Sequence, residues 1–150
     1  MRELQITNKK NSWPKGWGQK TSIMGVINLT PDSFSDGGDL NSSKDVLDQV
    51  NQFLCNGVDI VDLGAQSTRP GAQEVGSNIE IKRLIPFLKL IKSKYPEILI
   101  SVDTFNSDVA HEALLNGANW INDVTGGRRD MNILDVVSKF KCPFVITHSR

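Results

Sequence analysis

The chain alternates between short apolar runs and longer segments with helical spacing, and this alternation limits the folds open to it. The runs are rich in β-branched residues and mostly hydrophobic throughout, which is typical of parallel strands buried on both faces. They predict five strands, at residues 22–28, 58–63, 98–102, 119–122 and 143–147. Strands that alternate with helices form an open doubly wound sheet or a (β/α)8 barrel, with right-handed crossovers in either case.

The intervening segments predict four helices, because apolar residues recur in them at intervals of three and four. The stripes are Val46, Val50, Phe53 and Leu54; Ile81, Leu84, Ile85, Leu88 and Ile91; Ala110, Ala113 and Leu114; and Ile133, Val136, Val137 and Phe140. Ser77 and Glu80 have the spacing of a capping box, and Gly57 and Gly117 are placed to end helices.

A complete (β/α)8 barrel typically needs about 250 residues. If the fold is a barrel, the 150-residue chain supplies only its first half, roughly strands one to five of an α/β barrel of the TIM type. We expect an N-terminal extension at residues 1–21 and the N-terminal half of the barrel at residues 22–150, with the C-terminal half absent.

Composition and charge exclude several classes of partner. Seventeen basic and seventeen acidic residues cancel, and the pI is about 6.7, so the sequence has no electrostatic signature for nucleic acid or an anionic membrane. The first twenty residues contain no continuous apolar stretch. Cys55 and Cys142 are isolated and suggest neither a disulfide framework nor a zinc site. We expect a small-molecule ligand and a cytoplasmic location.

Polar residues gather after the predicted strands, where ligands bind in both α/β architectures. Long loops occupy residues 28–38 and 64–72, and Asp103 and Asn122 close the third and fourth strands. Both residues at the strand ends have a simpler interpretation: Asp103 could cap the following helix, and Asn122 could be a turn residue. Asp62, inside an apolar strand, is expensive to bury unpaired; it could support a neighbouring site residue or be structural, and the structural role is favoured.

Four motifs at these strand ends together resemble dihydropteroate synthase. They are Met-Gly-Val-Ile-Asn at 24–28 followed by Thr-Pro-Asp-Ser-Phe-Ser-Asp-Gly-Gly, Ser-Thr-Arg-Pro-Gly at 67–71, Ser-Val-Asp-Thr at 101–104 and Ile-Asn-Asp-Val at 121–124. The resemblance runs from about residue 22 to residue 150. It implies condensation of (7,8-dihydropterin-6-yl)methyl diphosphate with 4-aminobenzoate to give 7,8-dihydropteroate and diphosphate, with Mg2+.

The resemblance also implies roles for single residues at the strand ends. Asp103 and Asn122 match the family's pterin contacts, and a carboxylate and a carboxamide can satisfy the row of donors and acceptors on a pterin edge. Asn28 matches the contact to Mg2+ and pyrophosphate, through a neutral oxygen suited to a hard cation. No covalent nucleophile is implied, so catalysis would come from positioning and from stabilising the departing charge.

The two long loops would bind the other parts of the substrates. By resemblance, Thr68 and Arg69 approach the pyrophosphate or the carboxylate of p-aminobenzoate, which a guanidinium can bind bidentately. Phe34 and Pro70 would line the pocket for the aromatic acid. His148 ends the fifth predicted strand, and its role stays open.

Part of the family's site lies in later strands, so we expect the isolated chain to lack measurable synthase turnover. We also expect its open barrel to be poorly soluble or to self-associate. The resemblance also allows a homodimer in a full-length protein. Two alternatives remain. One is a pterin-dependent methyltransferase on a related barrel, and the other is a non-catalytic, pterin-binding remnant.

Overall fold

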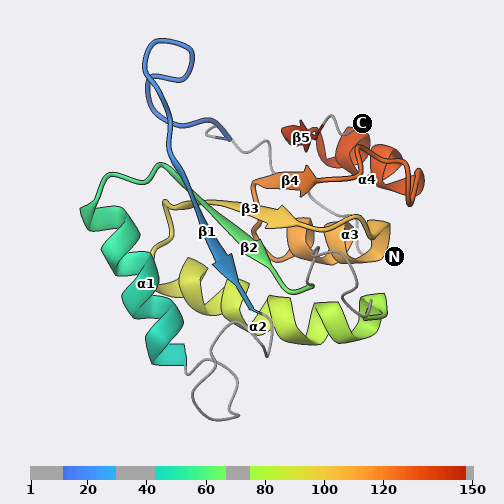
Figure 1. Ribbon diagram of the computed structural model, residues 1–150, viewed down its shortest axis with the longest axis horizontal. Helices are drawn as coiled ribbons and strands as arrows, with labels where there is room; N and C mark the ends of the chain where they lie inside the picture. Colours follow the sequence, from blue (N-terminus) through green and yellow to red (C-terminus); the bar gives the residue numbers. More distant parts are fainter. Residues whose placement is uncertain (1–11, 30–42, 67–74, 148–150) are drawn as a thin grey trace, which may run out of the picture.

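A computed structural model describes residues 12–29, 43–66 and 75–147. These residues contain a five-stranded parallel sheet (Figure 1). Its strands are β1 (Met24–Asn28), β2 (Ile60–Gly64), β3 (Leu99–Asp103), β4 (Trp120–Asp123) and β5 (Phe144–Ile146). All five predicted strands are confirmed, and every observed end falls within two residues of the predicted one.

The order of the strands decides between the two architectures. It is β1-β2-β3-β4-β5, with every neighbouring pair parallel. A doubly wound sheet reverses its order at a switch point and carries helices on both faces. Here each strand is added on the same side, so right-handed crossovers place the helices on one face. The sheet is the first five strands of a (β/α)8-type fold, as predicted, and Figure 1 shows the helices following one another around the fan of strands.

Four helices connect the strands and bury the predicted stripes against the sheet. They are α1 (Ser43–Cys55), α2 (Ser77–Lys94), α3 (Ser107–Leu115) and α4 (Asn132–Phe140). Their buried residues form one core with the strand residues that face them, Ile27, Leu63, Val61, Ile100, Val102 and Ile121. Leu54, in the last turn of α1, is the exception, because it is exposed.

Local signals at the helix ends were partly correct. Gly57 and Gly117 follow α1 and α3 with φ of +79° and +108°, a backbone conformation that glycine adopts without strain. The capping box, however, is wrong. The N-cap of α2 is Gly76, no side chain caps this end, and Glu80 instead accepts a hydrogen bond from Asn106 Nδ2 at 3.0 Å.

The opposite face of the sheet, here called the inner face, carries a second apolar cluster at the start of the strands. Ile60, Leu99 and Trp120 are buried there. The segment before β1 packs over this cluster: the rings of Trp13 and Trp17 lie 5.0 and 5.3 Å from the ring of Trp120, whose Nε1 donates to the Ser12 carbonyl. Trp120 therefore has a packing role.

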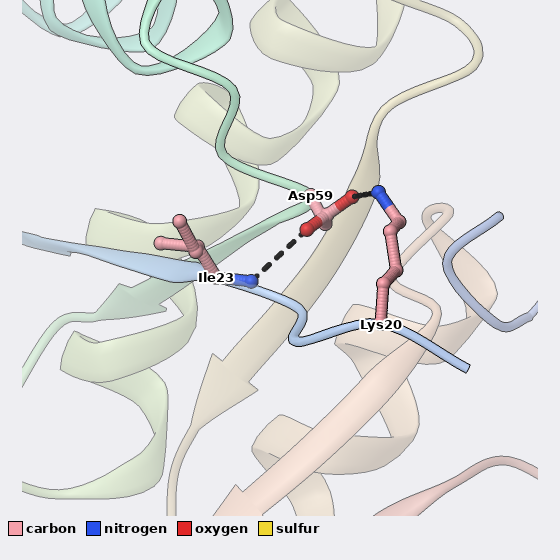
Figure 2. A network of polar contacts seen from close by, with 3 residues as sticks. All are labelled: Lys20, Ile23 and Asp59. Carbon is pink, nitrogen blue, oxygen red and sulfur yellow. Dashed lines mark hydrogen bonds and ion pairs between the residues drawn. The ribbon is translucent and has the colours of Figure 1, made fainter. Parts of the chain in front are cut away.

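Polar contacts fix the same segment to the beginning of β2 (Figure 2). Lys20 Nζ donates to Asp59 Oδ1 at 3.1 Å, and Asp59 Oδ2 accepts from the Ile23 backbone N–H at 3.0 Å. These contacts lie at the amino ends of the strands, away from the carboxyl ends where ligands bind in such folds. Within the described ranges, no helix is both long enough and apolar enough to cross a bilayer.

Candidate functional site

Three side chains predicted for the site lie in one row across the inner face, at the carboxyl ends of neighbouring strands. The register joins Asn28 with Gly64, Gly64 with Asp103, and Asp103 with Asn122. Side chains two residues apart on a strand share a face, so the row lies on the same face as the apolar cluster of Ile60. The sheet therefore brings Asn28, Asp103 and Asn122 together from β1, β3 and β4.

Gly64 keeps the space between two of these side chains open. A Cβ at this position would lie 3.6 Å from Asn28 Oδ1 and 3.8 Å from Asp103 Oδ2. Both are ordinary van der Waals distances, so a methyl group would fit there but would fill the gap. The Gly64 carbonyl accepts a hydrogen bond from Leu29 N at 2.6 Å, which holds the end of β1 beside β2. Gly64 therefore leaves backbone, and no side chain, between the oxygens of Asn28 and Asp103.

A second carboxyl group, that of Asp62, lies on β2 two residues before Gly64, on the same face of the sheet. Asp62 is only 3% exposed, and its Oδ2 accepts a hydrogen bond from Asn122 Nδ2 at 3.1 Å. The contact links β2 to β4 across β3. The sequence left open whether Asp62 supports a neighbouring site residue or is structural, and this hydrogen bond connects it with the predicted site residue Asn122. The available signal was its position, two residues before Gly64 and therefore on the same face.

Burial and neighbouring charge control the protonation of Asp103. Burial, and then the carboxylates of Asp62, Glu80 and Asp123, raise the pKa of Asp103 from 3.8 to about 7. Burial also raises the pKa of Asp62 and of Glu80. Asp103 therefore exchanges its proton near neutral pH and can offer either an acceptor or a donor to a ligand.

The interpretation of Asp103 as a cap of the following helix does not hold. The N-cap position of α3 is Asn106, and the Ser107 backbone N–H donates to Asp130 Oδ2 at 2.8 Å. The carboxylate that supports this helix end thus comes from the loop before α4. Asp103 is left at the end of β3 with no capping role among the described contacts.

The interpretation of Asn122 as a turn residue also fails, because the adjacent residue, Asp123, makes the contacts of the turn. Asp123 is fully buried and accepts hydrogen bonds from the backbone N–H groups of Thr125 and Gly127, at 2.7 and 2.6 Å. Asn122 belongs to β4 and points to the inner face. Its side chain is therefore available to the site.

The beginning of α2 holds the loops around this row. Glu80, 1% exposed, binds Asn106 of the loop after β3, as described above. Arg83 Nη1 donates to the Ala65 carbonyl, just after β2, at 3.4 Å. Four further predicted residues, Phe34, Thr68, Arg69 and Pro70, lie outside the described residues, as does His148. Their roles stay predictions.

Comparison with known proteins defines the class to which this fold and site belong. The profile of the pterin binding enzyme family matches residues 24–150, and the chain belongs to this family. Among curated relatives, the folate synthesis bifunctional protein of Arabidopsis thaliana is 50% identical over 136 residues, covering 89% of this chain and 28% of that protein. The dihydropteroate synthase of Clostridium beijerinckii is 42% identical over 133 residues, covering 89% and 49%.

Solved structures give the same result. The dihydropteroate synthase of Clostridium difficile, crystallised in the presence of pteroic acid, superimposes with a TM-score of 0.83 at 44% identity, covering 89% of this chain and 50% of that one. The enzyme of Xanthomonas albilineans with 4-aminobenzoic acid gives 0.77 at 36% identity, covering 86% and 47%. The chain thus spans about half the length of these synthases and a smaller share of the plant protein.

Proposed function

We propose that the chain carries part of the substrate site of a dihydropteroate synthase. The enzyme would join the 6-methylene carbon of (7,8-dihydropterin-6-yl)methyl diphosphate to the amino nitrogen of 4-aminobenzoate. The carbon–oxygen bond to diphosphate breaks, and the amine loses a proton. The observation that carries the proposal is the row of Asn28, Asp103 and Asn122 at neighbouring strand ends, where Gly64 places no side chain between the first two. Solved relatives, one crystallised in the presence of pteroic acid and one with 4-aminobenzoic acid, support it.

Asp103 and Asn122 would bind the pterin. They are register partners on adjacent strands, so their side chains reach the ligand from a rigid base. A pterin edge offers N–H donors and ring acceptors, which a carboxylate and a carboxamide complement. Donors from a bound pterin would favour the ionised form of Asp103 and lower its pKa from about 7. Binding should then release a proton near neutral pH.

The residues present fit a Mg2+ ion at the diphosphate. Among the described residues, no group of three or more His, Cys, Asp or Glu converges on one point. Mg2+ in phosphate-transfer sites commonly uses only one or two protein oxygens, with phosphate oxygens and water completing its shell. Asn28 Oδ1 is such an oxygen, and the neighbouring Gly64 places no side chain in front of it. A bound Mg2+ would neutralise charge on the leaving diphosphate.

The long loops would complete the site. Thr68 and Arg69 are proposed to bind the diphosphate or the carboxylate of 4-aminobenzoate, with Phe34 and Pro70 against its ring. Closure of these loops would exclude water from the electrophilic methylene carbon. No side chain forms a covalent intermediate in this scheme. The chain's contribution is to orient the two reactants and to stabilise the departing charge.

Ligand binding is a better test than turnover. The chain spans about half the length of the synthases, and we expect it to lack measurable turnover by itself. We expect calorimetric titration with pteroic acid to give a saturable heat that Asp103→Ala weakens at least tenfold. Asp59→Asn, at the opposite end of β2, is the matched control and should bind as the unaltered chain does. Equal affinity of the unaltered chain and Asp103→Ala would contradict the proposal.

The metal site is tested separately with inorganic pyrophosphate. We expect Mg2+ to strengthen pyrophosphate binding to the unaltered chain. Asn28→Ala should weaken this Mg2+-dependent binding without changing the affinity for pteroic acid. An Asn28→Ala chain that retains the full Mg2+ effect would remove Asn28 from the metal site.

A further inference from the structure

Asp62 lies beneath the proposed pterin site rather than in it. Its register partners are Val26 on β1 and Ser101 on β3, two residues before the row that contains Gly64 and Asp103. Its hydrogen bond goes past β3 to Asn122 on β4. The hydrogen bond from Asn122 to Asp62 therefore crosses the strand that carries Asp103. The charge of Asp62 is one of those that raise the pKa of Asp103.

A purely structural role explains this carboxyl group poorly. The side chain is 3% exposed, and Oδ1 has no hydrogen-bond partner among the described residues. Burial raises its pKa, while the nearby Ser101 and Asn122 side chains act against that rise. A buried carboxyl with one oxygen unpaired costs stability. Proteins retain such costs mainly where a site needs them.

The bond to Asn122 has a specific chemical effect. A carboxylate can only accept hydrogen bonds, so an ionised Asp62 always faces the amino side of the Asn122 carboxamide. One N–H of that group is then occupied by Asp62, while the second N–H and the carbonyl oxygen remain for a ligand. Without Asp62, the carboxamide could rotate by half a turn and exchange its donor and its acceptor.

We infer that Asp62 is a positioning residue, which fixes the order of donor and acceptor that Asn122 presents to the pterin. The role rests on the proposed pterin site, because it acts only through a ligand of Asn122. Asp62 does not touch the substrate in this scheme. It supplies specificity by preventing the carboxamide from turning over.

The decisive variant is Asp62→Asn, which keeps the shape of the side chain but can either donate or accept. Because the buried carboxyl is removed, we expect thermal stability equal to or above that of the unaltered chain. The affinity for pteroic acid should fall about tenfold, the equivalent of about one hydrogen bond. Asp59→Asn, just before the same strand, is the matched control: it should lower the stability of the chain and leave its affinity for pteroic acid unchanged.

A double-mutant cycle separates positioning from a general structural effect. In an Asn122→Ala background, Asp62→Asn should cause no further loss of affinity for pteroic acid. A full tenfold loss in that background, or unchanged affinity in the single variant, would overturn the role of Asp62. Absence of pteroic acid binding by the unaltered chain would instead overturn the proposed function on which the role depends.

Discussion

The ionisation of Asp103 should govern how the stability of the chain varies with pH. In the folded chain burial and three neighbouring carboxylates raise its pKa to about 7, whereas the ordinary value of the group is 3.8. Between these values the folded state holds a proton that the unfolded state has released. Stability must therefore fall as pH rises through this window and level off above it.

The magnitude follows from the same values. At about 1.4 kcal/mol for each pKa unit, ionised Asp103 lowers the free energy of unfolding by at most roughly 4 kcal/mol. Relaxation and water penetration around a partly buried group reduce this, and we expect a measured effect on the order of 2 kcal/mol. Asp103→Asn keeps the side-chain volume and removes the charge. The variant should therefore be the more stable protein above pH 7.

Urea unfolding at a series of pH values from 4 to 8 measures this effect for both proteins. The difference in free energy of unfolding should be small at pH 4 and should grow in favour of Asp103→Asn up to about pH 8. Asp62 and Glu80 also titrate with raised pKa values, but they are present in both proteins. A difference that does not vary with pH would refute the electrostatic account of Asp103.

Three further substitutions test other parts of the structure. Gly64→Ala should leave the melting temperature nearly unchanged, because its methyl group meets only ordinary contacts. It should weaken pteroic acid binding about tenfold by placing a methyl group between Asn28 and Asp103, and unaltered affinity would contradict this. Gly25→Ala would place a Cβ 2.6 Å from the Phe53 ring and should cost about 1–3 kcal/mol in urea unfolding, with Phe53→Leu restoring part of the loss. Asp59→Asn should lower the free energy of unfolding by about 1 kcal/mol at pH 7. The loss should be smaller in acid, because the Ile23 N–H and Lys20 lower the pKa of Asp59 in the folded chain. A loss that persists unchanged in acid would contradict this.

The strands and helices were predictable because their signals are local. Five apolar runs and four stripes each depend on neighbouring residues, and the structure confirms all nine elements. The capping box at Ser77 failed because Glu80 found a partner far along the chain, Asn106, which no local pattern contains. Trp13 and Trp17 pack against Trp120, which lies more than a hundred residues further along the chain, so no local pattern predicts their positions either.

The candidate site was predictable only in outline. Parallel strands bring their carboxyl ends to one edge, so Asn28, Asp103 and Asn122 could be expected to meet there. The role of Gly64 could not be expected, because the gap it leaves exists only once β1 and β3 flank β2. The pKa of Asp103 was equally inaccessible, since it depends on burial and on carboxylates from three other segments.

The sequence by itself therefore determined the type and order of the elements and the polar residues at the strand ends, because hydrophobic period and turn chemistry act over a few residues. Only the tertiary structure decided that the strands follow one another without reversal and that Asp62 bonds to Asn122. Register is a cooperative property of the whole sheet: a shift of one residue would turn Asp62 toward the helices and break the row above it.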